Sequence, residues 1–264
     1  MNAQTLASNW KRSRKPLGEF ADRLDDQGIP YLSHSKIFLY EQCPRCYHKK
    51  FILREPEEVS EAMRRGQSFH RAATNLYASL RDKTSLPTRS RLLAAPERKT
   101  LSKESVALLA NAIDLLRKHR WGDHEVISME EPFFMDLAPG LPPIIGITDL
   151  VLRLEETWIV VDHKTIRQKT NHDPSQLVLY AEHVRRMHSS KCVIGVFDSY
   201  RLVPDLKTAT RYPFQRIPVS VDRSLLPPLV TRYRKAWKKI SAMKPGHVPT
   251  ANSDCYKCRD RWYY

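Results

Sequence analysis

The stretch IIGITDLVLRL, residues 144–154, and the stretch WIVVDHKT, residues 158–165, decide how this chain folds. Most of their positions are apolar, which is typical of strands that are buried on both faces. Asp149 and Asp162 interrupt this apolar pattern. The residues between the stretches, Glu155-Glu156, predict a tight turn, so we expect the two strands to form an antiparallel hairpin.

Pairing across this hairpin brings two carboxylates together. A turn centred on Glu155-Glu156 sets Asp149 directly opposite Asp162, with the side chains ~5 Å apart. Alternation along the second strand puts Lys164 on the same face as Asp162. Two such carboxylates in a dry sheet repel each other, and one of them takes up a proton unless a cation lies between them.

A divalent metal ion is the simplest cation for this place. Mg²⁺ and Mn²⁺ prefer oxygen ligands, and the ammonium group of Lys164 adds a further positive charge. This combination makes a phosphodiesterase site, in which the ion polarises the phosphate and lowers the pKa of a bound water, while the lysine orients or activates that water. The alternative is a buried Asp–Lys ion pair, with Asp149 hydrogen-bonded to a loop.

The rest of the chain predicts one α/β domain, with helices first and a central mixed sheet after them. Ser33 is expected to cap a short helix that ends near Cys43. The longer helices are expected at about 57–80, with Val59, Met63, Ala73 and Tyr77 on the buried stripe, and at 102–119, 174–188 and 224–243. Further strands are expected at 129–137, 191–202 and 211–219. The polar, basic residues 1–30 are expected to form a mobile lead-in to a single domain over 31–264.

The charge of the chain favours a polyanionic partner. Its 264 residues include 44 Lys and Arg against 29 Asp and Glu, which gives a net charge of +15 and a pI near 9.7. Nucleic acid is the first candidate and an anionic membrane surface the second. Basic clusters that would contact phosphates are Arg64-Arg65, Arg185-Arg186 and the run of Arg232, Arg234, Lys235, Lys238 and Lys239, although each is also compatible with a solvated helix face.

Two further features concern the surroundings of the protein. No apolar run approaches the ~20 residues that cross a bilayer, and the N-terminal residues lack the apolar segment of a secretory signal. We therefore expect a cytoplasmic protein that does not bind a membrane. In such a reducing compartment, the pairs Cys43/Cys46 and Cys255/Cys258 predict one metal site. A tetrahedral site of four cysteines generically means zinc, although spacing alone does not separate zinc from an iron–sulfur cluster.

The paired aspartates lie in a pattern that resembles the core of the PD-(D/E)xK nuclease superfamily. The resemblance is greatest to its RecB-type branch, which includes the nuclease domains of AddAB-like recombination enzymes and the CRISPR spacer-acquisition nucleases. The segment GQSFH at 66–70 resembles the G-x-x-x-H helix of this branch, and QLVLY at 176–180 resembles its Q-x-x-x-Y motif. The segment 33–46 resembles its N-terminal part, and the likeness spans about residues 31–260 in the same order.

The resemblance implies a restriction-endonuclease-like core and a Mg²⁺- or Mn²⁺-dependent deoxyribonuclease. Such an enzyme would be a RecB-like exonuclease in DNA repair, recombination, or phage or CRISPR-type processing. The resemblance implies that His70 joins Asp149 and Asp162 as metal ligands, that the main-chain carbonyl of His163 completes the set, and that Gln176 helps Lys164 to position the water. It also implies a 4Fe–4S cluster at the four cysteines, which we favour over zinc although the family commonly has one N-terminal and three C-terminal cysteines.

Several of these residues have plainer interpretations. His70 on an apolar stripe is compatible with a core histidine, and Tyr180 with simple packing. Gln176 is also the expected partner of Asp173 in a capping box. Glu131 is expected either as an accessory ligand or in a salt bridge at the sheet edge.

Two other functions remain open. One is an idle nucleic-acid-binding module, and the other is an interaction subunit of a larger complex. A helicase or a repair or CRISPR-type protein is the expected partner, because the sequence contains no G-x-x-x-x-G-K-[ST] loop for ATP-driven unwinding of DNA. Single-stranded DNA is one expected substrate.

Overall fold

The computed structural model describes residues 17–93, 99–168, 171–206, 212–255 and 258. These residues belong to two compact units. The terminal unit comprises Met1–Glu58, Pro132–Ile147 and Ser224–Tyr264, and the central unit comprises Val59–Glu131 and Thr148–Arg223. The expectation of a single domain over 31–264 stays a prediction.

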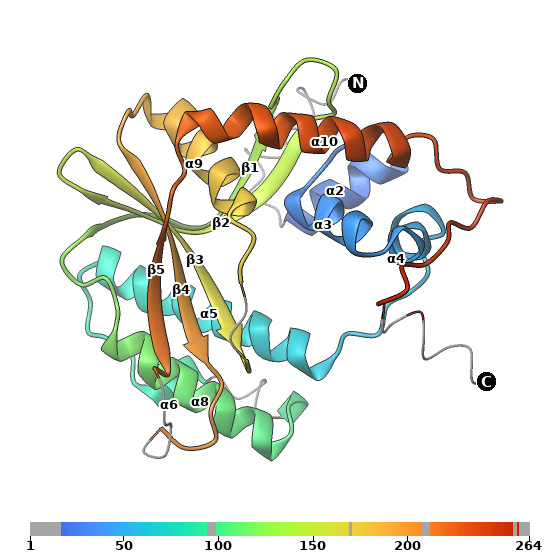
Figure 1. Ribbon diagram of the computed structural model, residues 1–264. Helices are drawn as coiled ribbons and strands as arrows, with labels where there is room; N and C mark the ends of the chain where they lie inside the picture. Colours follow the sequence, from blue (N-terminus) through green and yellow to red (C-terminus); the bar gives the residue numbers. More distant parts are fainter. Residues whose placement is uncertain (1–16, 94–98, 169–170, 207–211, 256–257, 259–264) are drawn as a thin grey trace. The chain divides into compact units, whose positions relative to one another are not determined.

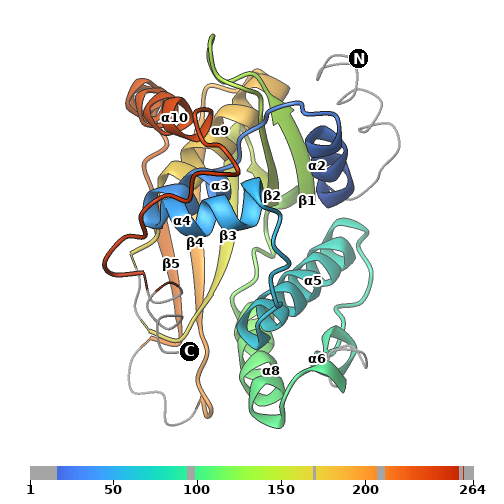
Figure 2. The same ribbon diagram turned by 90° about the vertical axis from the view of Figure 1, so that its right-hand side faces the viewer.

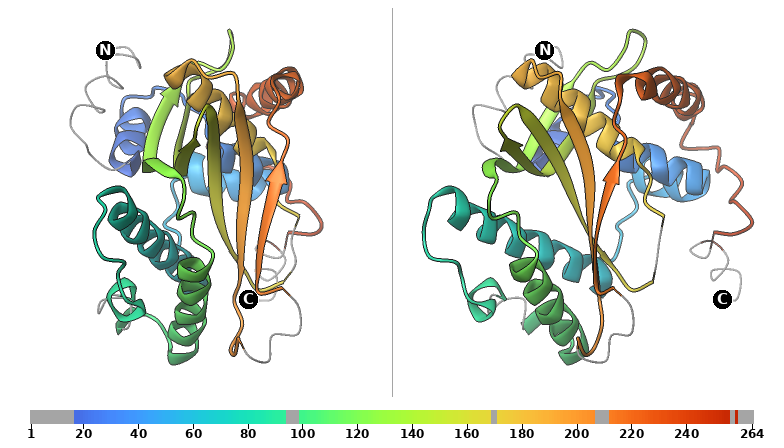
Figure 3. Two further views of the ribbon diagram at one scale, coloured as in Figure 1. Left: turned by 90° about the vertical axis from the view of Figure 1, so that its left-hand side faces the viewer. Right: turned by 60° about the vertical axis from the view of Figure 1, so that its left-hand side comes forward.

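A mixed five-stranded sheet forms the framework of the molecule, as the sequence predicts. Its strands follow the order β1-β2-β3-β4-β5, and all of them contribute residues to the central unit (Figures 1 and 3). β2 and β3 are antiparallel, β3 and β4 are parallel, and β4 and β5 are antiparallel. The strands are β1 (Glu125–Met135), β2 (Ile144–Leu154), β3 (Thr157–Ile166), β4 (Val193–Arg201) and β5 (Phe214–Val219).

The β2–β3 hairpin has the predicted register. Leu154 pairs with Thr157 and Leu150 with Val161, so the turn consists of Glu155 and Glu156. Glu155 is left-handed, with a φ of 53°, as two-residue turns between twisted strands require. The register places Asp149 and Asp162 at neighbouring positions immediately beyond the Leu150–Val161 pair.

Parallel strands need a crossover, and helix α9 (Ser175–His188) provides it between β3 and β4. The helix packs closely on β4 at Gly195. A Cβ atom at this glycine would lie 2.6 Å from Val221 Cγ1 and 3.3 Å from the Leu177 Cβ of α9. Glycine at this position therefore leaves room for the Val221 side chain and for the close approach of α9.

Helices α5 (Glu61–Arg81) and α8 (Lys103–Lys118) pack on the face of the sheet that carries Leu150, Leu152 and Val161 (Figure 2). The short helix α6 (Arg89–Leu92) lies between them in sequence. Fully buried side chains such as Leu76 and Leu109 fill this layer, and each contributes roughly 1.5–3 kcal/mol by burial. The side chains of Ser60 and Ser102 cap the two longer helices.

The buried face of α5 agrees with the predicted stripe at Ala73 and Tyr77, which are both buried, and differs from it at the N-terminal end. Val59, which precedes the helix, and Met63 are 40% and 41% exposed, whereas Phe69 and Leu76 are fully buried. The side chains of Phe69 and Leu76 determine which face of the helix packs on the core, because together they bury more apolar area than Val59 and Met63 would.

The terminal unit contains α2 (Leu17–Asp26), α3 (His34–Gln42), α4 (Pro44–Tyr47), a π-helical turn (His48–Ile52) and α10 (Leu226–Ile240). Ser33 caps α3 as predicted, since its hydroxyl accepts from the Lys36 N–H at 3.1 Å. Helix α2 was not expected, because its segment lies in the polar residues 1–30. Phe20 and Leu24, four positions apart, give it an apolar edge that is buried with Tyr31 and Ile145. The part of the predicted lead-in at 1–16 lies outside the described residues.

Candidate active site and cysteine cluster

Asp162 is a buried carboxylate at the centre of β3. Its side chain is 1% exposed and pairs with Lys164, whose Nζ lies 2.6 Å from Oδ2. Apart from this contact with Lys164, neither carboxylate oxygen has a hydrogen-bond partner among the described residues. Buried carboxylates are normally well provided with hydrogen bonds, so these two oxygens have the capacity to ligate a cation.

Asp149, at the neighbouring position on β2, has one oxygen engaged. Its Oδ2 accepts from the main-chain N–H of His163 at 2.8 Å. Burial, followed by the nearby charge of Asp162, raises the pKa of Asp149 to about 7. This is the repulsion between carboxylates that the hairpin register predicts, and a bound cation would remove it.

His70 approaches the same place from helix α5. Its Nδ1 lies 3.5 Å from Asp149 Oδ2 and 3.2 Å from Glu130 Oε1. Burial disfavours the charged imidazole, but the carboxylates of Asp149 and Glu130 outweigh this effect and raise the pKa of His70 to about 9. Ligand atoms of all three residues lie within 4.8 Å of one another, so the group has the donors and spacing to hold a metal ion.

Glu130 is the member of this group that the sequence analysis missed. For Glu131 the sequence leaves open an accessory ligand or a salt bridge at the sheet edge, and the role of its side chain stays a prediction. Its main-chain carbonyl accepts from Thr148 Oγ1 at 3.2 Å. Glu130 has a φ of 45° within β1, and this left-handed residue interrupts the regular alternation of side chains. A period-two pattern therefore does not identify the carboxylate that contacts His70.

A chain of hydrogen bonds holds Lys164. Its Nζ donates to Gln176 Oε1 at 3.0 Å, and Gln176 Nε2 donates to the Tyr180 hydroxyl at 2.7 Å. The Asp173 side chain accepts from the Ser175 N–H at 2.9 Å. Of the two interpretations open for Gln176, the structure therefore has the side chain facing Lys164. Burial raises the pKa of Tyr180 well above its usual value, so this hydroxyl is neutral.

His163 alternates with Asp162 and faces the opposite side of the sheet. Its ring stacks on Tyr77 with a centroid distance of 5.8 Å and an interplanar angle of 14°. Burial lowers the pKa of His163 to about 3, so the imidazole is neutral and belongs to the core. The role expected for His163 concerns its main-chain carbonyl, and that role stays a prediction.

Many of the arginines proposed as phosphate contacts are used by the fold. Arg65 donates to the Ser105 hydroxyl at 2.8 Å, and Arg185 donates to the Val221 carbonyl at 2.7 Å. Arg232 forms a bidentate pair with Glu41 in the terminal unit. Lys235, Lys238 and Lys239 are exposed on α10, so this part of the basic run is available to an anion.

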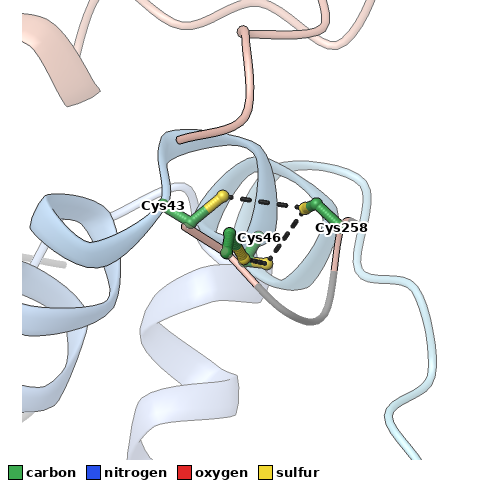
Figure 4. A group of neighbouring side chains, drawn as sticks. Cys43, Cys46 and Cys258 are labelled. Atoms are coloured by element: carbon green, nitrogen blue, oxygen red, sulfur yellow. Dashed lines mark hydrogen bonds between the residues drawn. The ribbon is translucent and has the colours of Figure 1, made fainter. Parts of the chain in front are cut away.

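The four cysteines of the two pairs come together in the terminal unit, although more than 200 residues separate the pairs. The sulfur of Cys46 lies 3.5 Å from those of Cys255 and Cys258, and the sulfurs of Cys43 and Cys258 are 3.7 Å apart (Figure 4). All four sulfurs lie within 4.8 Å of one another. Asn252 fixes the C-terminal segment nearby, because its side chain donates to the Gln42 carbonyl.

The local electrostatics of this cysteine cluster favour a thiolate at Cys43. Burial opposes ionisation, but hydrogen bonds from the main chain of Cys46 and Asn252 and from the neighbouring thiols lower its pKa to about 7. Thiolates are the form that binds metals. Cys192, the fifth cysteine of the chain, is exposed. No helix among the described residues is both long and apolar enough to span a membrane.

Comparisons with known proteins agree with this architecture. The crystal structure of a candidate exonuclease from Eubacterium rectale is similar over 89% of this chain and 90% of that one, with a TM-score of 0.58 and 13% sequence identity. A second structure, of SSO0001, matches over 62% of this chain and 71% of the SSO0001 chain, with 12% sequence identity. Its TM-score of 0.30 is too low to support an argument. No curated protein matches the sequence. The model of the PD-(D/E)XK nuclease superfamily matches residues 31–262, and the chain belongs to this superfamily.

Proposed function

We propose that this protein is a metal-dependent nuclease of the RecB-like branch that hydrolyses phosphodiester bonds in DNA. The observation that carries the proposal is Asp162, a carboxylate that is 1% exposed and, apart from Lys164 at 2.6 Å, has no hydrogen-bond partner among the described residues. A site without chemistry has no reason to retain such a desolvated charge beside a second carboxylate. Membership of the nuclease superfamily supports the same conclusion.

Asp149, Asp162 and His70 are the residues that would hold a divalent ion, with Glu130 as a fourth donor and the His163 carbonyl as a fifth. Oxygen donors with one imidazole fit Mg²⁺ or Mn²⁺. When bound, the ion polarises the scissile phosphate and lowers the pKa of an attacking water. To take part, His70 must release the proton that its carboxylate neighbours stabilise.

Lys164 is held between Asp162 and Gln176, so its ammonium group has a fixed position beside the carboxylates. A fixed cation at this point orients the water through a hydrogen bond and offsets the negative charge that builds up on the phosphate. Tyr180 acts through Gln176, because its neutral hydroxyl accepts from the amide that holds Lys164.

For the cysteine cluster, we infer a structural metal that ties the N-terminal segment at Cys43 to the C-terminal segment at Cys258. The sulfur separations of 3.5–3.7 Å are close to the edge of a tetrahedron of thiolates around one zinc ion, about 3.8 Å for Zn–S bonds of about 2.3 Å. In a 4Fe–4S cluster each thiolate binds a different iron, which holds the sulfurs farther apart. The distances therefore favour zinc over the cluster that the resemblance implies.

The biological setting that we propose is the cytoplasm, where this nuclease would process DNA together with a helicase, repair or CRISPR-type partner. The charge of +15 supports a nucleic-acid substrate. The absence of an ATP-binding G-x-x-x-x-G-K-[ST] motif from the sequence supports a separate partner for unwinding.

Cleavage assays of the purified chain test the nuclease proposal. End-labelled single-stranded and double-stranded DNA should be degraded with Mg²⁺ or Mn²⁺, and EDTA should stop the reaction. Products that shorten progressively from an end would identify an exonuclease. Binding of DNA without cleavage under all metal conditions would contradict the proposal and favour an idle binding module.

A further inference from the structure

Gly66 is a helical glycine that the fold does not require. It lies in the second turn of α5 and, unlike Gly28 and Gly140, does not have a positive φ. Apart from its chain neighbours and the backbone of its own helix, a Cβ atom at Gly66 would meet no atom of the described structure within 4 Å, whereas one at Gly195 would clash at 2.6 Å. Glycine weakens a helix interior relative to alanine, so the benefit of Gly66 must lie in the empty space beside it.

This space is a hollow that runs along the exposed face of α5. Its volume is about 600 Å³, and it is lined on the helix by Met63, Gly66, Gln67, His70, Arg71 and Thr74. His70 lies one helical turn beyond Gly66 on the same face. His70 and Glu130 line the hollow and also belong to the carboxylate and histidine group, so the hollow leads directly to the proposed reaction centre.

The lining fits the backbone of a nucleic acid. Arg71 brings a guanidinium, which pairs with phosphate, and Gln67 brings an amide that hydrogen-bonds phosphate or sugar. Met63 is 41% exposed and offers an apolar surface to a sugar ring. The only acidic side chain among the residues that line the hollow is Glu130, at the end where the proposed metal site begins.

We propose that this hollow seats the nucleic-acid strand next to the scissile phosphate, and that Gly66 is a positioning residue that keeps its path open. The inference rests on the proposed nuclease function and adds the course of the substrate strand across α5. A side chain at residue 66 would project into that path and compete with the strand for space.

The substitutions Gly66→Ala and Gly66→Leu test this inference, with Asn75→Leu as the matched control. Asn75 is exposed on the same helix, outside the hollow, and leucine there also raises helix propensity. Gly66→Ala should raise Tm by roughly 1–4 °C. Binding of a fluorescent single-stranded DNA in EDTA should nevertheless weaken about threefold for Gly66→Ala and tenfold or more for Gly66→Leu. In Mn²⁺, KM should rise more than kcat falls.

Asn75→Leu should leave DNA affinity and KM at the wild-type values. If Gly66→Ala and Gly66→Leu also bind and cleave DNA like the wild type, the inference is overturned. Cleavage by the wild type would in that case still support the proposed nuclease function. If Gly66→Leu does not fold, the DNA affinity and KM of Gly66→Ala alone test the inference. Weaker DNA binding by a more stable Gly66→Ala supports the inference even if the wild type does not cleave, because the binding assay contains no metal.

Discussion

The two candidate metal sites are built in opposite ways. The carboxylate site that we propose combines Asp149 and Asp162, which are 13 positions apart in sequence and are brought to neighbouring positions by a two-residue turn. The cysteine cluster uses pairs separated by more than 200 residues, which meet only when the terminal unit is assembled. The carboxylate site brings like charges together in a buried sheet. The cysteine cluster brings together thiols that one metal can coordinate and so connect.

This difference separates function from stability. A buried pair of carboxylates lowers the stability of the fold, so its presence indicates a function that needs it. Ligands from distant segments instead let the free energy of metal binding contribute to folding, which indicates a structural role. The two sites should therefore respond in opposite ways when one ligand is removed.

The largest expected effect is on catalysis. Asp162→Asn removes the buried charge and keeps the side-chain volume, so it should lower the cleavage rate by at least ~10³-fold, since the metal supplies several kcal/mol of charge stabilisation. Its Tm should match or exceed that of the wild type, because the repulsion with Asp149 is gone. Cleavage rates in Mg²⁺ together with thermal melts check both expectations, and wild-type cleavage by this variant would refute the assigned site.

The opposite response is expected at the cysteine cluster. Cys255→Ser should lower Tm by more than about 5 °C and lose the bound metal, because one ligand of a site that ties two chain segments is missing. Cys192→Ser is the matched control, since Cys192 is exposed and outside the cluster. Elemental analysis and calorimetry are the measurements, and equal melting of the two variants would show that the cysteine cluster does not stabilise the fold.

A smaller effect is expected at the residues that hold Lys164. Gln176→Ala removes the acceptor of the Lys164 ammonium and should lower kcat about tenfold, with little change in metal affinity. Tyr180→Phe removes only the acceptor of the Gln176 amide and should have a weaker effect. Single-turnover rates separate these variants, and a loss as large as that of Asp162→Asn would mean that Gln176 contributes more than positioning.

The smallest effect concerns Lys36, a buried charge in the terminal unit. Its Nζ lies 3.3 Å from the centre of the Tyr31 ring and 3.8 Å from Asp25 Oδ1, so this charge has partners inside the terminal unit. Burial lowers the pKa of Lys36 from 10.5 to about 8. Between these pH values the unfolded chain binds more protons, so the stability of the wild type relative to Lys36→Met should rise with pH.

Denaturant titrations of the two proteins at pH 7.5 and 10, chosen as roughly the two ends of this window, measure the difference. A relative stability that falls or stays constant over the range would show that Lys36 is not desolvated as described.

The features that sequence predicts well are those that depend on local rules. The β2–β3 register follows from the two turn residues and from alternation, and the cap at Ser33 follows from residue type. Glu130 could not be predicted, because its positive φ departs from the alternation on which the interpretation of β1 rests. Ala73 and Tyr77 of the predicted α5 stripe lie in the core together with Phe69 and Leu76. Val59 and Met63 are exposed instead, because which residues of a helix are buried also depends on tertiary packing.

Anomalous diffraction from crystals grown with Mn²⁺ tests the central claim most directly, because data at the manganese and zinc absorption edges locate both metals in one experiment. The account predicts a manganese peak roughly 2–2.5 Å from carboxylate oxygens of both Asp149 and Asp162, and a zinc peak about 2.3 Å from the four cysteine sulfurs. A manganese peak that contacts neither aspartate would contradict the assignment of this cluster as the catalytic metal site.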